Sequence, residues 1–382
     1  MPRKLIIKEL GPIKEAEIEQ KPLTILVGPQ ASGKSLAAII SYFFESLETE
    51  FLMLTPNTVL KWIKENPKSA KDRINDLLHL TLTFPIRDLA NDNSSIHFID
   101  ESKKINWEIN IKNDDLYINE ALIEDIMKWI KSLRKKSKTM LFENYPYNYI
   151  FIPAERIIFS INNLWISEIY PPILKPHRIE LLLCRFNAIL QKIYHNYRSS
   201  ISHVYSENIP MLEKDALSSN IVFDFSRGFL GVINGLYPLI KISSGQAAAW
   251  SIFMIFSILG KFKPKIFIEE PEINLHPDAQ VAVAKAISLL VNQGSHIFIT
   301  THSPYIIYAI NVMLQRFKSF KGNVPKEEQF WLNPDNVSAY CTSQGKFENI
   351  IDREDTGLIG EEELERAANE LGKEFDKLLN IK

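Results

Sequence analysis

Gly28-Pro29-Gln30-Ala31-Ser32-Gly33-Lys34-Ser35 is the stretch that decides the fold class of this 382-residue chain. It matches every fixed position of the phosphate-loop pattern G-x-x-x-x-G-K-[ST]. The residues before it, Leu23–Val27, are mostly apolar and β-branched, which predicts a short buried strand. After it, apolar residues recur at helical spacing from Leu36 to Leu47. A loop between a strand and a helix points backbone N–H groups and the positive helix end at a polyphosphate, so the stretch predicts nucleotide binding.

Two side chains of this loop have roles that the pattern itself predicts. The Lys34 ammonium group supplies a positive charge to the β- and γ-phosphate oxygens, and the Ser35 hydroxyl is a ligand for Mg²⁺. The alternative, an accidental glycine-rich turn, is disfavoured by the motifs that follow later in the chain. The residues predicted to bind nucleotide here are Gly28, Pro29, Gln30, Ala31, Ser32, Gly33, Lys34 and Ser35.

Composition restricts the class of protein. Hydrophobic residues make up 46% of the chain and charged residues 24%, as in soluble globular proteins. The net charge of −2 gives no overall bias toward nucleic acid. Cys184 and Cys341 lack the spacing of a disulfide scaffold, a zinc site or a thiol enzyme. The start of the chain has no apolar signal-peptide core, and the longest apolar run, Ala247–Leu259, is too short to span a bilayer. We therefore expect a cytoplasmic protein without a membrane segment.

The N-terminal half predicts a sheet edge followed by an insertion. Residues 3–9 and 13–19 alternate in polarity around Leu10-Gly11-Pro12, which predicts an antiparallel hairpin leading into the loop strand. Residues 48–148 break this pattern and predict an inserted α/β segment, with strands at 95–100 and 105–111 and a helix over 119–137. Basic residues end that helix at 131–138. They fit either a nucleic-acid patch or a solvated helix terminus, and the second reading is favoured.

The rest of the chain predicts a helical segment followed by a second group of strands. Tyr149-Ile150-Phe151-Ile152-Pro153 is typical of a buried strand, and residues 161–215 have helical spacing. Two strand-like pieces follow, Ile221 to Phe225 and Leu236 to Ile242, split by glycines. Strand, helix and strand over 265–300 predict a parallel crossover unit. Further strand candidates lie near 328–341, and a final acidic helix is expected from Gly360 to about Leu379.

Two of these predicted strands end in residues suited to phosphoryl chemistry. A phosphate-loop hydrolase requires one carboxylate to support Mg²⁺ and another to orient the attacking water. We assign these roles to Glu269 and Glu270, respectively. His302 follows the next parallel strand and is expected on the γ-phosphate side of the same pocket. Acidic pairs often end strands simply by facing solvent, but the phosphate loop favours the functional interpretation.

Ser243-Ser244-Gly245-Gln246 opens the apolar helix that precedes these strands. A serine-glycine turn at a helix start is by itself only a cap. The same N–H groups and helix dipole can bind the γ-phosphate of a nucleotide held by a second molecule. On this second interpretation Ser243, Gly245 and Gln246 bind nucleotide in trans, so that one subunit completes the site of another.

Together these motifs resemble the phosphate loop, signature, magnesium strand, D-loop and switch histidine of ABC-type ATPases. The phrases Glu269-Glu270-Pro271-Glu272, Leu275-His276-Pro277 and Thr301-His302-Ser303-Pro304 are similar to those of the SMC, RecF and OLD-like branch, which includes ATPases of bacterial phage-defence operons. So is Phe151–Arg156, at the place of the strand that leads to the Q-loop. The resemblance covers residues 1–45, 149–160 and 220–382.

Three departures from the family pattern stand out. Ser244 replaces a frequent glycine, and no glutamine follows the strand at 149–153, which leaves Glu155 or Arg156 as its replacement. Glu269 replaces the usual aspartate and is one methylene longer, which implies a looser metal shell or slower turnover. No Asp-x-Asp pair follows Pro304, so a Toprim nuclease domain is not expected and nuclease or toxin activity is assigned to a partner.

The predicted fold class is α/β, with an ABC-type P-loop ATPase head, an N-terminal antiparallel β lobe, an α/β insertion and a helical subdomain. The expected N-terminal ATPase lobe consists of residues 1–47 and 149–160, and the insertion of residues 48–148. The helical subdomain is expected over 161–215 and the C-terminal ATPase lobe over 216–382.

The leading hypothesis is an ATPase that binds ATP and Mg²⁺ and assembles head to tail around them. The resemblance implies the sensor or scaffold ATPase of an anti-phage system, which controls a separate effector, a nuclease or toxin encoded nearby, and responds to DNA or a phage protein. The alternative is a RecF- or SMC-like DNA repair clamp gated by ATP. Near-neutral charge and the absence of a long heptad coiled coil weigh against the clamp. An ABC transporter subunit fits less well still, because of the insertion and Leu275-His276-Pro277.

Overall fold

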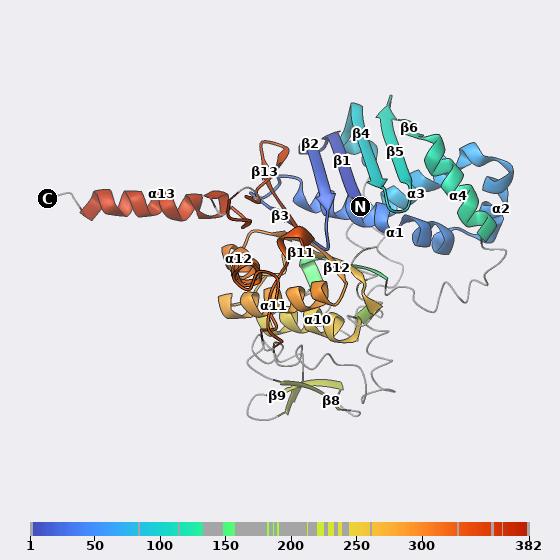
Figure 1. Cartoon of the computed structure of the whole chain (residues 1–382). Coiled ribbons are helices and arrows are strands. Elements are labelled where there is room, and N and C mark those ends of the chain that lie inside the picture. Colours follow the sequence, from blue (N-terminus) through green and yellow to red (C-terminus); the bar gives the residue numbers. More distant parts are fainter. Residues whose placement is uncertain are drawn as a thin grey trace.

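One large mixed sheet with helices on both faces forms the body of the protein (Figure 1). The computed structural model describes residues 3–82, 85–113, 115–132, 148–156, 182, 186, 189–190, 212, 220–224, 228–232, 236–238, 244–259, 262–326, 328–352, 355–360 and 362–379. The α/β fold class predicted from the sequence is confirmed by this architecture. The helical subdomain expected over 161–215 lies almost entirely outside the described residues.

The predicted N-terminal hairpin is present and leads directly into the phosphate loop. β1 (Arg3–Leu10) pairs antiparallel with β2 (Ile13–Gln20), and β3 (Leu23–Val27) is buried along its whole length. α1 (Lys34–Leu54) starts directly after Gly33 and continues past residue 47, where the sequence analysis ended the N-terminal lobe. The loop is therefore set between a central strand and a long buried helix.

The sheet has eleven strands in the order β6-β5-β4-β1-β2-β14-β13-β3-β12-β11-β7. The part around the phosphate loop is parallel: β3 lies between β13 and β12, and β11 lies between β12 and β7. The part that contains the N-terminal hairpin is antiparallel. The remaining strands are β4 (Ala90–Asp100), β5 (Ile105–Lys112), β6 (Asp115–Ile118), β7 (Tyr149–Ile152), β11 (Lys265–Glu269), β12 (His296–Thr301), β13 (Val337–Ser343) and β14 (Lys346–Asn349).

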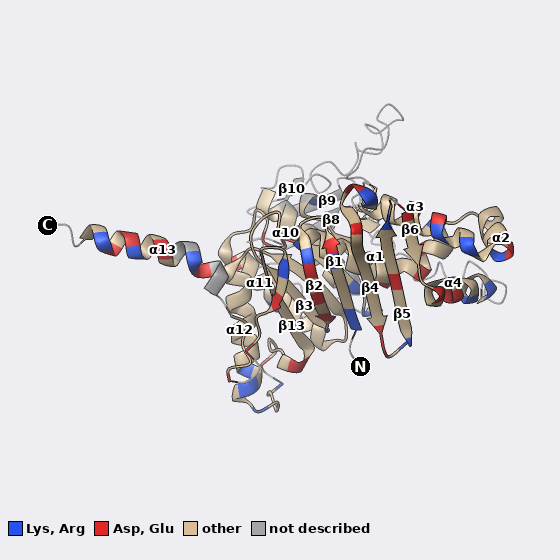
Figure 2. Cartoon of the chain, turned by 90° about the horizontal axis from the view of Figure 1, so that it is seen from above, with Lys and Arg blue, Asp and Glu red and all other residues tan. Residues whose placement is uncertain are grey.

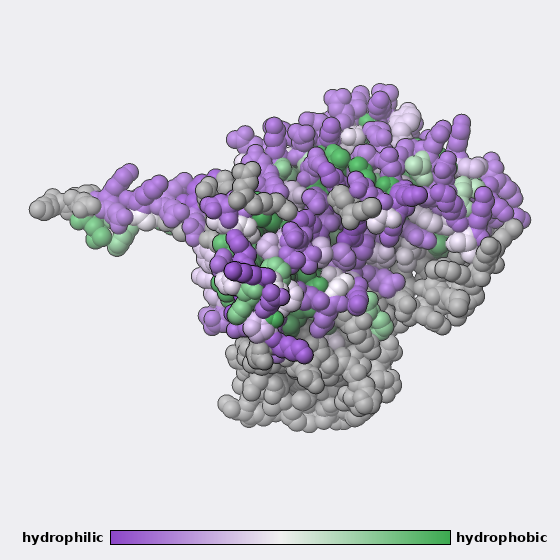
Figure 3. All heavy atoms as spheres, viewed as in Figure 1, coloured by the Kyte–Doolittle hydropathy of each residue, from purple (hydrophilic) through white to green (hydrophobic). Residues whose placement is uncertain are grey.

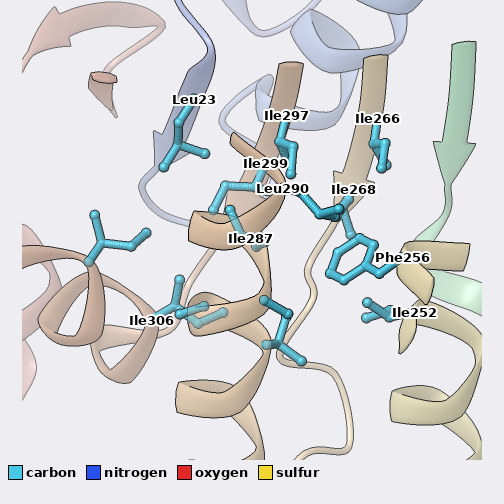
Figure 4. Close-up of a cluster of buried hydrophobic side chains, with 14 of the residues drawn as sticks. Leu23, Ile252, Phe256, Ile266, Ile268, Ile287, Leu290, Ile297, Ile299 and Ile306 are labelled. Carbon is cyan, nitrogen blue, oxygen red and sulfur yellow. The ribbon is translucent and has the colours of Figure 1, made fainter. Parts of the chain in front are cut away.

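Side-chain alternation explains why helices cover both faces of the parallel strands. In β11 and β12, the isoleucines at 266, 268, 297 and 299 face one cluster, while Phe267 and Phe298 face the other. Figure 4 shows the isoleucine side packed against Phe256, Ile287 and Leu290. Because both faces are apolar, the strands are stable only with helices above and below. The helices on the isoleucine side are α10 (Ser244–Leu259), α11 (Pro277–Asn292) and α12 (Pro304–Ser319).

The second face is covered by α1 and by helices of the segment that the sequence analysis treated as an insertion. Phe44 of α1 stacks on Phe98 of β4, with ring centroids 5.4 Å apart, and Trp107 of β5 stacks on both rings. β4 pairs with β1, so this segment extends the main sheet. Its helical elements are α2 (Asn57–Glu65), η1 (Pro67–Ser69), α3 (Ala70–Leu82), η2 (Ile86–Asp88) and α4 (Glu120–Ser132).

Several predicted boundaries are corrected by the structure. The glycines at 228 and 231 lie between the two predicted strands, β8 (Asn220–Asp224) and β10 (Leu236–Pro238), but they belong to a third strand, β9 (Gly228–Val232), which pairs with both in a small second sheet. The strand candidates near 328–341 reduce to β13, which starts at Val337 after the short helix η6 (Pro334–Asn336). Predicted strand residues 239–242 and helix residues 133–137 lie outside the described part of the chain.

The final helix, α13 (Glu362–Leu379), extends away from the body of the protein (Figures 1 and 2). Charged residues of both signs lie along it (Figure 2). Its apolar residues Leu371, Phe375, Leu378 and Leu379 are each 59–68% exposed, and Figure 3 shows apolar atoms on this helix. Within the described residues, no helix is both long enough and apolar enough to cross a membrane.

Candidate nucleotide-binding site

The phosphate loop has the backbone conformation that its two fixed glycines permit. Gly28 has a φ of 136° and Gly33 a φ of 97°, values that residues with a Cβ rarely adopt. The Lys34 ammonium group turns back over the loop and donates hydrogen bonds to the carbonyl oxygens of Gly28 (2.9 Å) and Pro29 (2.6 Å). The Lys34 side chain is thus already directed into the loop that the sequence assigns to phosphate.

A strand from the far end of the chain closes this loop on one side. The Thr342 hydroxyl on β13 donates a hydrogen bond to Oγ of Ser32. A Cβ added at Gly28 would lie 2.2 Å from Thr342 Oγ1 and 2.9 Å from its carbonyl oxygen. Sequence analysis did not select Thr342, because its place beside the loop depends on a strand pairing across more than three hundred residues.

Two carboxylates lie close enough to Lys34 to act on its charge. Burial lowers the pKa of the Lys34 ammonium group below its ordinary value, and Glu270 and Glu272 both oppose this shift. Sequence analysis selected Glu270 for the site but not Glu272. The structure therefore brings Lys34 at the start of α1 and Glu270 after β11 to the same edge of the sheet.

Glu269 and Glu270 differ in environment although they are adjacent. Glu269 is the last residue of β11 and is 8% exposed, whereas the side chain of Glu270 is 32% exposed. Glu270 has a φ of 42°, a left-handed conformation that costs a non-glycine residue roughly 1–2 kcal/mol. Its N–H group donates to the carbonyl oxygen of Thr300 on β12 (2.9 Å). The two neighbouring carboxylates therefore differ in their access to solvent, and their separate roles stay predictions.

His302 lies beside Glu270, as the sequence analysis expected. The distance from Nε2 of His302 to Oε1 of Glu270 is 3.6 Å. Burial, and then the charge of Lys34, lower the pKa of His302, while Glu270 opposes the shift. A neutral imidazole therefore prevails near pH 7. Ser303 caps α12 by accepting a hydrogen bond from the N–H group of Ile306, and Pro304 occupies the first helical turn. This cap fixes the backbone directly after His302.

Glu272 connects the turn after β11 to the end of β12. Its Oε1 accepts a hydrogen bond from the backbone N–H of His302 at 2.6 Å. Burial raises the pKa of the Glu272 carboxyl, and hydrogen bonds from neighbouring groups act in the opposite direction. The only sequence signal for this role was its place in the phrase Glu270-Pro271-Glu272, which does not distinguish a linking carboxylate from a solvent-facing one.

Arg156 is a further residue whose position the sequence left open. It belongs to the short helix η3 (Ala154–Arg156) after β7, and its side chain is fully buried. Its Nη1 donates to the carbonyl oxygen of Glu269 (3.0 Å), and its Nη2 donates to the carbonyl oxygens of Glu270 and Pro271 (both 3.1 Å). The guanidinium group thus contacts the backbone of the turn that presents both candidate carboxylates.

The predicted metal ligands fit a site that a nucleotide completes. Ser35 is exposed at the start of α1, and the Glu269 carboxyl is at the end of β11. Among the described residues, no group of three or more histidine, cysteine or acidic side chains could hold a metal alone. Mg²⁺ is commonly bound through one or two protein oxygens together with substrate phosphates and water. A hydroxyl and a carboxylate are oxygen donors of the kind that this ion prefers.

The predicted in-trans residues belong to a separate element. Gly245 and Gln246 lie in the first turn of α10 and are partly exposed, and α10 packs against α11. Ser243 lies outside the described residues. Their assignment to nucleotide binding stays a prediction.

Comparison with known proteins gives a partial family match. Residues 165–307 match the model of a family described as "AAA ATPase domain". This range contains Glu269, Glu270 and His302 but not the phosphate loop. No curated protein matches the chain.

Solved structures align over nearly the whole chain but at low similarity. The SMC head domain from Thermotoga maritima covers 91% of this chain and 98% of its own, with 11% identity and a TM-score of 0.46. An Smc head domain with an extended coiled coil from Pyrococcus furiosus, bound to the C-terminal domain of ScpA, covers 98% and 99%, with 13% identity and a TM-score of 0.45. The ADP conformation of an ATP-binding cassette of an ABC transporter covers 96% and 95%, with 14% identity and a TM-score of 0.36.

The family match and the phosphate loop cover different parts of the chain. The match lies over the second half of the site, and the phosphate loop supplies the first half. Both parts of the site are therefore of a kind found in ATPases.

Proposed function

We propose that this protein binds ATP with Mg²⁺ and hydrolyses it. The observation that carries the proposal is the convergence of Lys34, Glu270 and His302 at one edge of the parallel strands. These residues come from α1, the end of β11 and the end of β12. Lys34 and Glu270 both act on the pKa of His302, and Glu270 also acts on the pKa of Lys34. Ligands of open α/β sheets bind at the carboxyl ends of the strands, which is where these groups meet.

Each residue of this group has a separate step in the proposed reaction. Lys34 exchanges its contacts with the loop carbonyls for the β- and γ-phosphate oxygens. Glu270 is partly exposed and lies beside His302, so it orients the attacking water and accepts its proton. Neutral His302 donates a hydrogen bond toward the γ-phosphate. Ser35 and Glu269 would hold Mg²⁺, which when bound neutralises phosphate charge.

Self-association is part of the proposal. The first turn of α10, with Gly245 and Gln246, offers N–H groups and a positive helix end to the γ-phosphate in a second copy. Binding energy from that phosphate would then favour the closed assembly over the open one. The motif resemblance supports a further step, in which closure restrains or releases a separate effector in phage defence. Reconstitution with the proteins encoded nearby, with and without ATP, tests that step.

The proposed reaction is tested by comparing single-residue variants in a phosphate-release assay. Glu270→Gln should lower kcat by about 10²-fold or more while ATP still binds. Lys34→Ala should weaken ATP binding itself. Glu15→Gln, an exposed carboxylate on β2, is the matched control and should keep the wild-type rate. A Glu270→Gln variant that hydrolyses ATP at the wild-type rate would refute the assignment of Glu270.

Solution mass tests self-association separately. With ATP and Mg²⁺, Glu270→Gln should shift to a dimer or larger species, whereas Lys34→Ala should not. A mass that nucleotide leaves unchanged in every variant contradicts closure around ATP.

A further inference from the structure

Arg156 is a fully buried arginine whose guanidinium group contacts the backbone of the turn after β11. Its hydrogen bonds reach the carbonyl oxygens of three consecutive residues, Glu269, Glu270 and Pro271, and that of Pro153 in its own segment (3.3 Å from Nη1). Burying a guanidinium group is costly, so its hydrogen bonds must be made for the folded state to tolerate it. The contacts are therefore a fixed part of the native structure.

These contacts act on a residue with a strained backbone. Glu270 has a positive φ, which a non-glycine residue keeps only where its surroundings hold it. Its N–H group is held by the Thr300 carbonyl oxygen on β12, and its own carbonyl oxygen is held by Arg156. The N–H and C=O groups of Glu270 are thus both fixed, the first by β12 and the second by η3. The direction of the Glu270 carboxylate toward Lys34 and His302 follows from that backbone.

The chemistry of arginine suits this position in a way that lysine does not. The guanidinium group is planar, stays protonated, and presents five N–H donors in a rigid fork. Here Nη1 and Nη2 divide four carbonyl oxygens between them. A lysine ammonium group has a single nitrogen, which cannot contact both the carbonyl oxygens bound by Nη1 and those bound by Nη2.

We propose that Arg156 is a positioning residue that holds Glu270 in the conformation needed for ATP hydrolysis. The proposal rests on the proposed function of Glu270. It adds that the conformation of Glu270 is held by a second residue, Arg156. It also links two regions of the chain, because Arg156 ends the described segment after β7 while Glu270 follows β11. If the segment after β7 moved, the Arg156 side chain would transmit that movement to Glu270.

The test is a double-mutant comparison of Arg156→Lys, Glu270→Gln and the two combined. Arg156→Lys should lower kcat by about 10- to 100-fold, since a misplacement near 1 Å costs about 10²-fold, while the affinity for ATP changes less than about twofold. Adding Arg156→Lys to Glu270→Gln should lower the rate no further. Rates that fall by the product of the two single effects would overturn the proposal, as would an Arg156→Lys protein with the wild-type kcat.

A second measurement distinguishes positioning from general loss of stability. Ile287→Val, in the core of α11, is the control for a packing defect and should leave kcat unchanged. Hydrogen exchange of a peptide covering residues 266–275 should accelerate in Arg156→Lys, because the Glu270 N–H bond to Thr300 loosens. Unchanged exchange there contradicts the proposal whether or not the protein hydrolyses ATP.

Failure of this inference and failure of the proposed function give different results. If wild type hydrolyses ATP and Glu270→Gln does not, but Arg156→Lys is fully active, only the positioning role is wrong. If Glu270→Gln is fully active, the proposed function of Glu270 is wrong as well. Should Arg156→Lys not fold, Arg156→Ala with added guanidinium at millimolar concentration replaces it. Recovery of kcat on adding guanidinium supports the proposal, and a folded Arg156→Ala protein without recovery contradicts it.

Discussion

His296 provides the sharpest prediction about stability, because its ring lies between two cations. It starts β12 at the sheet edge opposite the nucleotide site, and its Nδ1 is 2.6 Å from Nη2 of Arg3 on β1. Lys265 on β11 is the second cation, and Glu45 on α1 binds both Arg3 and Lys265. A neutral ring accepts the hydrogen bond from Arg3. A protonated ring would add a third positive charge to those of Arg3 and Lys265, and the Glu45 carboxylate that binds both would have to balance all three.

This arrangement predicts a loss of stability in mild acid. Burial, followed by the charges of Arg3 and Lys265, lowers the pKa of His296 from 6.5 to about 4. Below pH 6.5 the unfolded chain takes up a proton that the folded protein takes up only near pH 4. Stability is therefore complete above pH 6.5, declines as the pH falls toward 4, and stays lost below that. A difference of about 2.5 pKa units corresponds to at most about 3.4 kcal/mol.

Urea unfolding at pH 8, 7, 6 and 5 measures this effect, with His296→Gln as the control. The wild-type free energy of unfolding should fall between pH 7 and 5, and the fall should be smaller in His296→Gln. The difference between the two proteins removes the contribution of other groups, such as His302, whose pKa is also lowered. Equal pH dependence in the two proteins would refute the reasoning.

Three further substitutions have expected outcomes. Gly28→Ala should destabilise the protein and prevent binding of a fluorescent ATP analogue, because the new methyl group would meet Thr342 at 2.2 Å in a backbone with a φ of 136°; a stable, binding variant contradicts this. Glu45→Gln should cost about 3–5 kcal/mol in thermal or urea unfolding, because it removes the buried partner of Arg3 and Lys265; a change below about 1 kcal/mol shows that the pair is not needed. Gly372→Ala, with nothing within 4 Å of the new methyl group, should stabilise α13 by about 1 kcal/mol and raise helicity in circular dichroism; unchanged helicity argues against a regular helix there.

Local patterns predicted the parts of the site that depend on neighbouring residues in the sequence. The phosphate loop, its strand and its helix were predicted because polarity, glycines and Lys34 occur within a short segment. Glu270 and His302 were selected because parallel strands place their carboxyl ends at one edge, and the structure brings them together. His276-Pro277 and Ser303-Pro304 prove to be helix caps followed by proline, which explains their sequence pattern in local terms.

The parts that sequence reasoning missed depend on contacts between distant segments. Thr342 reaches the loop only because β13 pairs with β3, and no local signal predicts that partner. Arg156 was named, together with Glu155, as a replacement for a glutamine, but its burial and its carbonyl contacts depend on the position of the turn after β11. The pairing of β4 with β1 has the same origin. A single sequence reports which residues are apolar, and it does not report which strand lies beside which.

The position of β3 in the sheet has a consequence for how the chain folds. β3 (Leu23–Val27) is made long before its two neighbours, β12 (His296–Thr301) and β13 (Val337–Ser343). Until those segments have emerged from the ribosome, both edges of β3 lack their native partners. Such long-range pairing slows folding and leaves apolar strands exposed to aggregation in the meantime. The nucleotide loop therefore gains its native support only after β13 has been made.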